Sequence, residues 1–408
     1  MNKPFQKKDI LAICFVAGIL LFMMVQSLSA AENADFAAFK KQQTQGANDL
    51  TVEFQAYKKA LEKDFSLYVK VYKAAFEARK KKISEVWGDY RPGDKTHWVE
   101  YDKNGVRKSV NFESGDVELE MLVDKRTAQK QVEAALKKRI LALLLTSKRE
   151  AFNRDDIAQA VEKKMANKPT VKAAEVPDTP LLSNLVPELK SDNLEKITRI
   201  SKKFEKQAII DVRAAKKKNK KVVRMKFKIP TDAPRKSKEF LHRARKIADK
   251  EKIPLTLIMG VMETESAFNP MAKSGVPAYG LMQIVPRSAG KDATGYLFGK
   301  PKVLSPSYLY NPDKNIEIGG AYLHILYFRY LKKIKDPVSR LYRAIAAYNT
   351  GAGNVAKAFS GKTNINKAAI KINRLTPKQV YQKLRRDLPY KETQHYVKRV
   401  STNMVKYQ

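Results

Sequence analysis

A change of hydrophobic period between residues 87 and 97 constrains the fold of this chain more than any other feature. From about Asp35 to Trp87, apolar residues recur three or four positions apart among charged ones, as in Phe54, Tyr57, Leu61, Phe65, Tyr68 and Val71. This spacing is typical of helices that pack on one face and expose Lys and Glu on the other. From His97 the pattern alternates instead, which is typical of strands.

The alternating stretch predicts a three-stranded antiparallel meander. Its expected strands are His97–Tyr101, Val106–Phe112 and Val117–Val123. Asn104-Gly105 and Ser114-Gly115 are turn signals between them. Alanine-rich helices are expected from about Thr127 to Met165, and further helices at 236–251, 254–266, 315–333, 337–349 and from 376 onward. The patterns therefore predict an α+β fold, with a mainly helical domain after a smaller α+β domain.

The segment between these two parts is proline-bearing and then strongly basic. Residues 166–193 carry Pro169, Pro177, Pro180 and Pro187, which predicts a linker or a loosely packed connection. Residues 199–250 hold 20 Lys/Arg against 5 Asp/Glu, and within them Val222–Ile229 alternates apolar and basic residues. That alternation predicts a half-buried strand that joins the upstream sheet. The expected domains are 32–165, a 166–235 linker with the basic strand, and 236–408.

The formal net charge of +38 favours an anionic partner. For the basic strand alone, a solvated edge that blocks aggregation is an equal alternative, but the charge of the whole chain favours a surface that holds an anionic polymer. The four histidines, His97, His242, His324 and His395, are too scattered for a metal site. We expect neither a metal nor a cofactor.

Residues 1–31 have the layout of an export signal. Three lysines precede the apolar run Ile10–Val25, and small residues follow with cleavage expected after Ala30 or Ala31. An uncleaved membrane anchor is the alternative, although a spanning helix needs about 20 apolar residues. Export argues against nucleic acid as the partner. The only cysteine, Cys14, lies in the apolar run, and Ala31 stands where a lipoprotein would carry its lipidated cysteine.

Glu265 is the best candidate for acid chemistry. On a helix that begins near Pro254 it shares a face with Ile258, Val261 and Met262, whereas Glu263 lies on a less apolar face. Apolar surroundings raise the pKa of a carboxyl group and let it hold a proton near neutral pH. Glu265 is therefore a candidate general acid. The alternative is a solvated or capping glutamate near a helix end.

Three ordered blocks surround this glutamate and extend along the chain: Glu265–Ser274, Gly280–Gln283 and Ala347–Gly353. Together they closely resemble the family-1 lytic transglycosylases, which have a lysozyme-like domain that cleaves bacterial peptidoglycan. The resemblance covers about Ile253 to the C-terminus. The helices with Trp87, the meander around Trp98 and the basic strand resemble, less specifically, the N-terminal domain of a membrane-bound branch of that family.

The resemblance implies that Glu265 is the sole catalytic acid and base. It would protonate the glycosidic oxygen between N-acetylmuramic acid and N-acetylglucosamine, then take the proton of the muramic acid 6-hydroxyl as that group attacks the anomeric carbon. The product would be a 1,6-anhydro sugar. One carboxylate suffices because the substrate supplies its own nucleophile, unlike most glycosidases. The implied partner is the peptidoglycan glycan strand in the periplasm, with peripheral contact to anionic membrane surfaces.

Six further positions match substrate-binding residues of that family, and each has a structural alternative: Ser274, Met282, Gln283, Tyr348, Asn349 and Tyr396. The serine is expected near the sugar acetamido group or as a turn hydroxyl. Met282 lines the cleft or packs in the core, and Gln283 donates to a sugar or begins a helix. Tyr348 and Asn349 match the family's Tyr-Asn pair, whose tyrosine hydroxyl would orient the catalytic carboxyl or stabilise developing charge. Tyr396 resembles a late cleft tyrosine, and the alternative for all three is a structural role in the core.

The chain departs from the family pattern at Val276, where related sequences often carry a second serine, and in the following Pro277–Gly280. We expect this loop to shape a subsite. A goose-type lysozyme, which shares the fold but uses water, is the nearest enzymatic alternative. A non-catalytic, cationic wall-binding protein is an alternative from another class, and the intact blocks argue against it.

Overall fold

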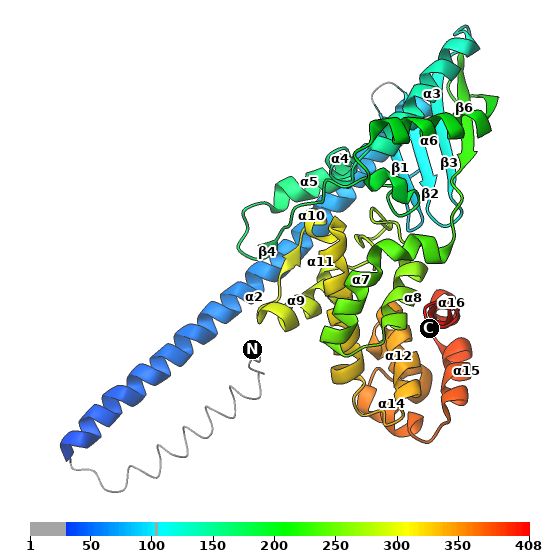
Figure 1. Cartoon of the computed structure of the whole chain (residues 1–408). Helices are drawn as coiled ribbons and strands as arrows, with labels where there is room; N and C mark the ends of the chain where they lie inside the picture. Colours follow the sequence, from blue (N-terminus) through cyan, green and yellow to red (C-terminus); the bar gives the residue numbers. More distant parts are fainter. Residues whose placement is uncertain (1–29, 103–104) are drawn as a thin grey trace. The chain divides into compact units, whose positions relative to one another are not determined.

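The computed structural model describes residues 30–102 and 105–408, without the side chains of residues 30–39 and 46–49. Nearly all of the predicted export segment 1–31, with Cys14, lies outside this range. Among the described helices, none is both long enough and apolar enough to cross a membrane. Figure 1 shows the order of the elements along the chain.

The first described element is one long helix, α2 (Ala30–Trp87), where we predicted several packed helices. Between Asp35 and Trp87 the sequence contains no proline and a single glycine, so nothing in it ends a helix. The chain divides into two compact units, 1–60 and 61–408, and α2 runs across the boundary. Within the second unit α2 buries Leu61, Phe65 and Tyr68 in the core.

A five-stranded antiparallel sheet has the order β1-β2-β3-β6-β5. Its strands are β1 (His97–Tyr101), β2 (Val106–Asn111), β3 (Asp116–Asp124), β5 (Ile209–Ala214) and β6 (Lys220–Lys228). The predicted meander is confirmed. The predicted basic strand is β6, and it joins the meander by pairing with β3, with Leu119 opposite Met225 and Val117 opposite Phe227. We did not predict β5.

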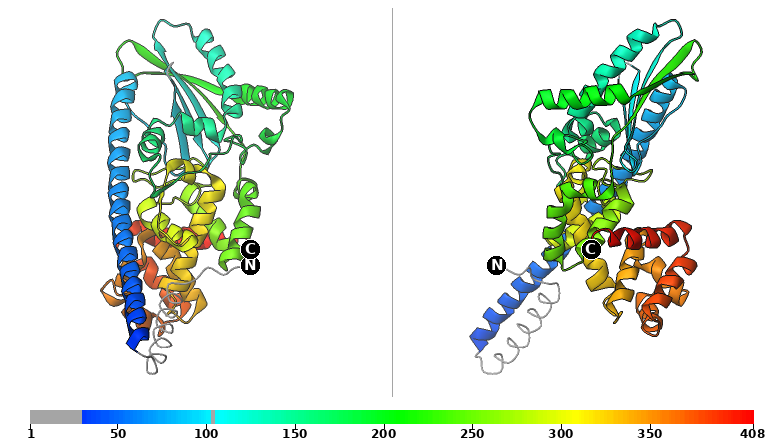
Figure 2. Two further views of the ribbon diagram at one scale, coloured as in Figure 1. Left: turned by 90° about the vertical axis from the view of Figure 1, so that its left-hand side faces the viewer. Right: turned by 45° about the vertical axis from the view of Figure 1, so that its right-hand side comes forward.

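Helix α3 (Gln129–Leu145) packs against β3 and β6, and α6 (Leu194–Gln207) packs against α3 and β6 (Figure 2). Phe204 of α6 stacks on Phe227 of β6, with ring centroids 5.1 Å apart. Helices α4 (Lys148–Asn153) and α5 (Asp156–Met165) follow α3. The alanine-rich stretch is therefore helical, as predicted, and its helix α3 covers the sheet together with α6.

The stretch 166–193, which we predicted to be a linker or loosely packed, packs its apolar residues tightly. Leu181, Leu182, Leu185 and Val186 are all buried in the core. The stretch also contains β4 (Val171–Lys172), which pairs in parallel with β7 (Val303–Leu304), and the 3-10 helix η2 (Pro187–Lys190). Prolines end regular structure here, but the clustered leucines still supply a hydrophobic face.

The rest of the chain is helical: α7 (Ala233–Glu251), α8 (Leu255–Ser266), the π-helical η3 (Pro286–Gly290), α9 (Lys291–Phe298), α10 (Pro306–Tyr310), α11 (Pro312–His324), the π-helical η4 (Ile325–Tyr330), α12 (Pro337–Thr350), α13 (Ala352–Ser360), α14 (Ile365–Ile372), α15 (Pro377–Asp387) and α16 (Lys391–Val405). The α+β class is confirmed. The predicted division within 61–408 stays a prediction, because these residues form one compact unit.

Candidate active site

Helix α8 carries Glu265 one residue before its end, as predicted. Ile258, Val261 and Met262 are fully buried, and Glu265 is only 4% exposed. Helix α16 packs closely on α8, since a Cβ added at Gly260 would lie 2.8 Å from the Met404 side chain. Glu265 therefore lies in the last turn of a helix that is enclosed by protein on most sides.

Opposing effects act on the Glu265 carboxyl. Burial raises its pKa, while the ammonium group of Lys95 and the hydroxyl of Tyr396 lower it. The Lys95 Nζ atom donates to Glu265 Oε2 at 3.0 Å. Burial outweighs the two opposing groups, so the pKa lies above its usual value, in the direction that the sequence predicted. A carboxyl in this state is suited to donate a proton.

The backbone after Glu265 is held in a rarely adopted conformation. Ala267 and Phe268 have φ values of 49° and 65°, a left-handed region that costs side-chain-bearing residues free energy. The Ser266 hydroxyl supports the turn, because its oxygen accepts from the Phe268 backbone N–H at 3.1 Å. The same hydroxyl lies 2.8 Å from the carbonyl oxygen of Leu281, which ties the turn to the second sequence block.

Tyr348 and Tyr396, both predicted site residues, lie near the carboxyl of Glu265. Burial raises the pKa of each phenol well above its usual range, and the proximity of Glu265 adds to the effect. The Tyr348 hydroxyl donates to the carbonyl oxygen of Met282 at 2.8 Å. Both phenols remain protonated at ordinary pH, so each can act only as a neutral hydrogen-bonding group.

The other four predicted residues occupy more structural positions. Asn349 accepts a hydrogen bond from the Thr393 hydroxyl at 2.7 Å. Gln283, at φ 47°, donates to the Gly280 carbonyl at 3.2 Å. The Met282 side chain is fully buried against Gly319, and the Ser274 hydroxyl bonds to the carbonyl of Val276. Their predicted contacts with substrate stay predictions.

No sequence pattern predicted that the region before β1 reaches this site. Besides Lys95, whose ammonium contacts Glu265, the preceding Asp94 accepts from the Lys273 backbone N–H at 3.3 Å through its carbonyl oxygen. The Tyr72 hydroxyl of α2 donates to the Ser274 carbonyl at 2.7 Å. A lysine between a helix and a strand has no motif, so only the fold could place it here.

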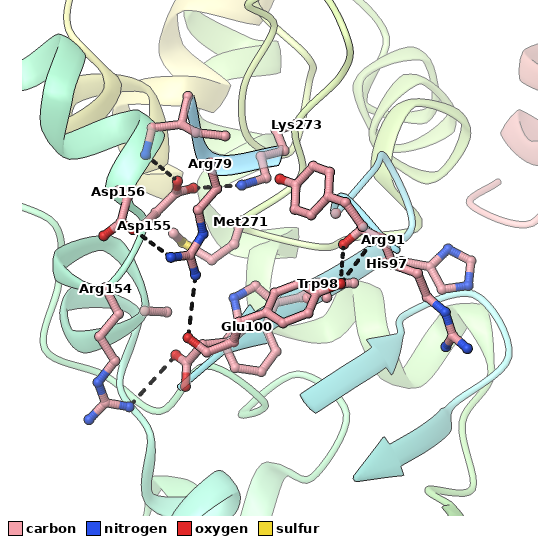
Figure 3. A pocket seen from close by; sticks show the side chains of 16 residues that line it. Arg79, Arg91, His97, Trp98, Glu100, Arg154, Asp155, Asp156, Met271 and Lys273 are labelled. Carbon is pink, nitrogen blue, oxygen red and sulfur yellow. Dashed lines mark hydrogen bonds and ion pairs between the residues drawn. The ribbon is translucent and has the colours of Figure 1, made fainter. Parts of the chain in front are cut away.

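Ion pairs strengthen this attachment around a pocket between α2, β1, α5 and the segment 271–273 (Figure 3). Lys273 lies 2.8 Å from the carboxylate of Asp155, and Arg79 lies 2.6 Å from that of Asp156. The segment after Glu265 is therefore fixed by elements that precede it by more than a hundred residues. Across the part of the chain that the structure describes, no group of three His, Cys, Asp or Glu residues could hold a metal ion.

Comparison with known proteins assigns this region to a family. Residues 243–371 match the model of the transglycosylase SLT domain. This part of the chain is similar to an SLT domain. The matched stretch contains Glu265 and every predicted substrate-binding residue except Tyr396, which confirms the resemblance drawn from the three sequence blocks.

Curated relatives match somewhat less than half of the chain. A membrane-bound lytic murein transglycosylase C from Serratia proteamaculans is 41% identical over 181 residues, which are 44% of this chain and 49% of the relative. Its counterpart from Actinobacillus pleuropneumoniae is 43% identical over 173 residues, 42% and 46% of the two chains. The chain thus spans about half the length of the curated relatives it matches. The 70 kDa soluble lytic transglycosylase of Escherichia coli is 20% identical, with a TM-score of 0.33 over 68% of this chain and 43% of that one.

Proposed function

We propose that this protein is a peptidoglycan lytic transglycosylase in which Glu265 acts first as general acid and then as general base. One observation carries the proposal: Glu265, within the SLT-matched region, is a buried carboxyl with a raised pKa, and the neutral phenols of Tyr348 and Tyr396 lie near it. The relatives' names, which describe lytic murein transglycosylases, support the same substrate.

The reaction balances with one carboxyl group. Glu265 donates its proton to the oxygen that links N-acetylmuramic acid to N-acetylglucosamine, and the bond from that oxygen to the anomeric carbon breaks. The muramic acid 6-hydroxyl then bonds to the anomeric carbon, and its proton returns to Glu265. No water enters, so the product is a 1,6-anhydro end. In this proposal the nearby phenol of Tyr396 helps to orient the carboxyl group, while Tyr348 donates its hydroxyl to the Met282 carbonyl.

The formal net charge of +38 supports a place on anionic surfaces. We also propose that the enzyme is periplasmic. Electrostatic attraction, which salt weakens, would hold it on glycan strands and on anionic membranes. The relatives are named membrane-bound, which agrees with that location.

A hydrolytic enzyme is the second candidate, because another carboxylate lies close by. Lys95 Nζ is 3.8 Å from Glu392 Oε1 as well as 3.0 Å from Glu265. A hydrolase needs such a group to activate water. Glu392 is strongly exposed, with 76% of its side chain accessible, which fits a rim position better than a base in an enclosed site.

Digestion of purified sacculi decides between these candidates. We expect Glu265→Gln to lower lysis by on the order of 10³-fold, while the protein still binds sacculi. Glu263→Gln, two residues away and bonded to Lys406 and Tyr407, is the matched control and keeps its activity. Wild-type products should be lighter than hydrolysed ones by one water. Undiminished lysis by Glu265→Gln, or hydrated ends that disappear in Glu392→Gln, would overturn the proposal.

A further inference from the structure

A lysine from outside the SLT-matched region contacts the catalytic candidate directly. Lys95 lies in the turn between α2 and β1, 170 residues before Glu265. Its ammonium group reaches the Glu265 carboxylate at 3.0 Å and that of Glu392 at 3.8 Å. No other lysine or arginine among the described residues forms an ion pair with Glu265.

The turn that presents Lys95 is built rigidly. Asp94 Oδ1 accepts hydrogen bonds from the backbone N–H groups of Thr96 (2.8 Å) and His97 (2.7 Å). The pKa of Asp94 falls to about 2: burial raises it, but the bonds from His97 and Thr96 lower it more strongly. Asp94 is therefore ionised throughout the range in which an enzyme of this kind works, and the turn keeps its shape.

The same turn is attached to the loop that follows Glu265. The Asn269 side chain donates to the Lys95 carbonyl at 3.4 Å, and the Lys273 backbone N–H donates to the Asp94 carbonyl. Lys95 and Glu265 thus belong to one hydrogen-bonded frame, although they lie far apart in sequence. A shift of the turn would move the ammonium group relative to the carboxyl.

We propose that Lys95 is a positioning residue for Glu265, supplied by the upstream region, which orients the carboxyl and favours its ionised form. The inference rests on the proposed function and deepens it. A single carboxyl group that must give up a proton and then take one back needs both forms to be accessible. Burial favours the protonated form, and the ammonium group favours the ionised form that exists after proton donation.

Four charged or titratable groups among the described residues act on this carboxyl. They are Lys95 from the turn, Tyr348 from α12, and Glu392 and Tyr396 from α16. Glu392 repels the Glu265 carboxylate, and both phenols stay neutral. Lys95 is thus the one cation among the described residues that opposes burial at this carboxyl.

The test compares pH profiles of kcat/KM on sacculi for wild type, Lys95→Met and Lys95→Arg. The general acid must be protonated, so activity falls as pH rises through the pKa of Glu265. We expect Lys95→Met to move this alkaline limb to higher pH and to lower the optimum rate by on the order of tenfold, because the carboxyl loses its orienting bond. Lys95→Arg should restore both. Lys391→Met, at an exposed lysine of α16, removes the same charge without a contact to Glu265 and should leave the limb in place.

Two outcomes separate failure of this inference from failure of the proposed function. If lysis depends on Glu265 but Lys95→Met leaves the limb where wild type has it, Lys95 only holds the turn, and the inference is wrong. If the wild type gives hydrated products, or needs no Glu265, the proposed function fails instead. An NMR titration of the Glu265 carboxyl, identified by its loss in Glu265→Gln, measures the effect of Lys95→Met without reference to activity. An unchanged titration would also overturn the inference.

Discussion

Two glutamates, one in the upstream sheet and one in the SLT-matched region, are almost equally buried and differ in chemistry. Glu120 of β3 is fully buried and Glu265 of α8 is 4% exposed. Burial raises the pKa of both carboxyl groups, yet the net pKa of Glu120 is lowered and that of Glu265 is raised. The difference lies in the partners that the fold gives each one.

Glu120 has three arginines around it. Arg107 donates to Oε2, Arg213 lies 2.6 Å from Oε1, and Arg91 lies 3.4 Å from Oε2. Among the residues that the structure describes, the one cation paired with Glu265 is Lys95, whose side chain is 37% exposed. The sheet compensates its buried charge fully and so holds it ionised, whereas the site compensates its charge incompletely and lets a proton bind. The candidate site is thus distinguished by a buried carboxyl group that has too few cationic partners to stay ionised.

The largest expected effect on stability comes from removing the charge of Glu120, which the three arginines compensate. Glu120→Gln leaves the buried guanidinium of Arg107 without its main partner, and we expect a loss of about 3–5 kcal/mol in the free energy of unfolding, measured by urea denaturation. Glu118→Gln, on the same strand but 27% exposed and paired with Arg91 and Arg224, is the control and should lose about 1 kcal/mol or less. Equal losses in the two variants would mean that the burial of Glu120 carries no special weight.

Removal of the Glu265 charge is expected to stabilise the protein instead of destabilising it. Because the folded-state pKa of Glu265 is raised, ionisation favours the unfolded chain, and this residue costs stability as pH rises from about 4.3, the value for an unfolded chain, through the folded pKa. We expect Glu265→Gln to gain on the order of 1–2 kcal/mol at pH 7 and nothing near pH 4. Thermal unfolding of both proteins across that range measures the difference, and a gain that did not change with pH would contradict the ionic explanation.

The sequence predicted the helices and strands better than it predicted how they pack. Alternation located the meander and β6, and helical spacing located α8 with Glu265 on its buried face. The predicted packed helices before residue 87 proved to be one helix, since spacing shows that a segment is helical but not where it turns. The prolines of the stretch 166–193 predicted a linker or a loosely packed connection, but its leucines are buried in the core.

The candidate site shows the same limit. Glu265 and Tyr348 lie in the sequence blocks and Tyr396 matches a further family position, so all three could be named from the sequence. Lys95 and Tyr72 act through contacts 170 and 202 residues away, and nothing in their local sequence indicates those contacts. Only the packing of α2 and the turn before β1 against the SLT-matched region creates them.

The contact between these two regions gives the smallest expected effect. The Tyr72 hydroxyl donates to the Ser274 carbonyl at 2.7 Å, so Tyr72→Phe removes one partly buried hydrogen bond and should cost about 1 kcal/mol in urea denaturation. Because the loop with Ser274 loosens while Lys95 still contacts Glu265, KM on sacculi should rise and the alkaline limb of the pH profile should stay. Tyr308→Phe is the control, since its buried hydroxyl has no hydrogen-bond partner among the described residues. A moved limb in Tyr72→Phe would show that the loop, rather than Lys95 alone, sets the protonation of Glu265.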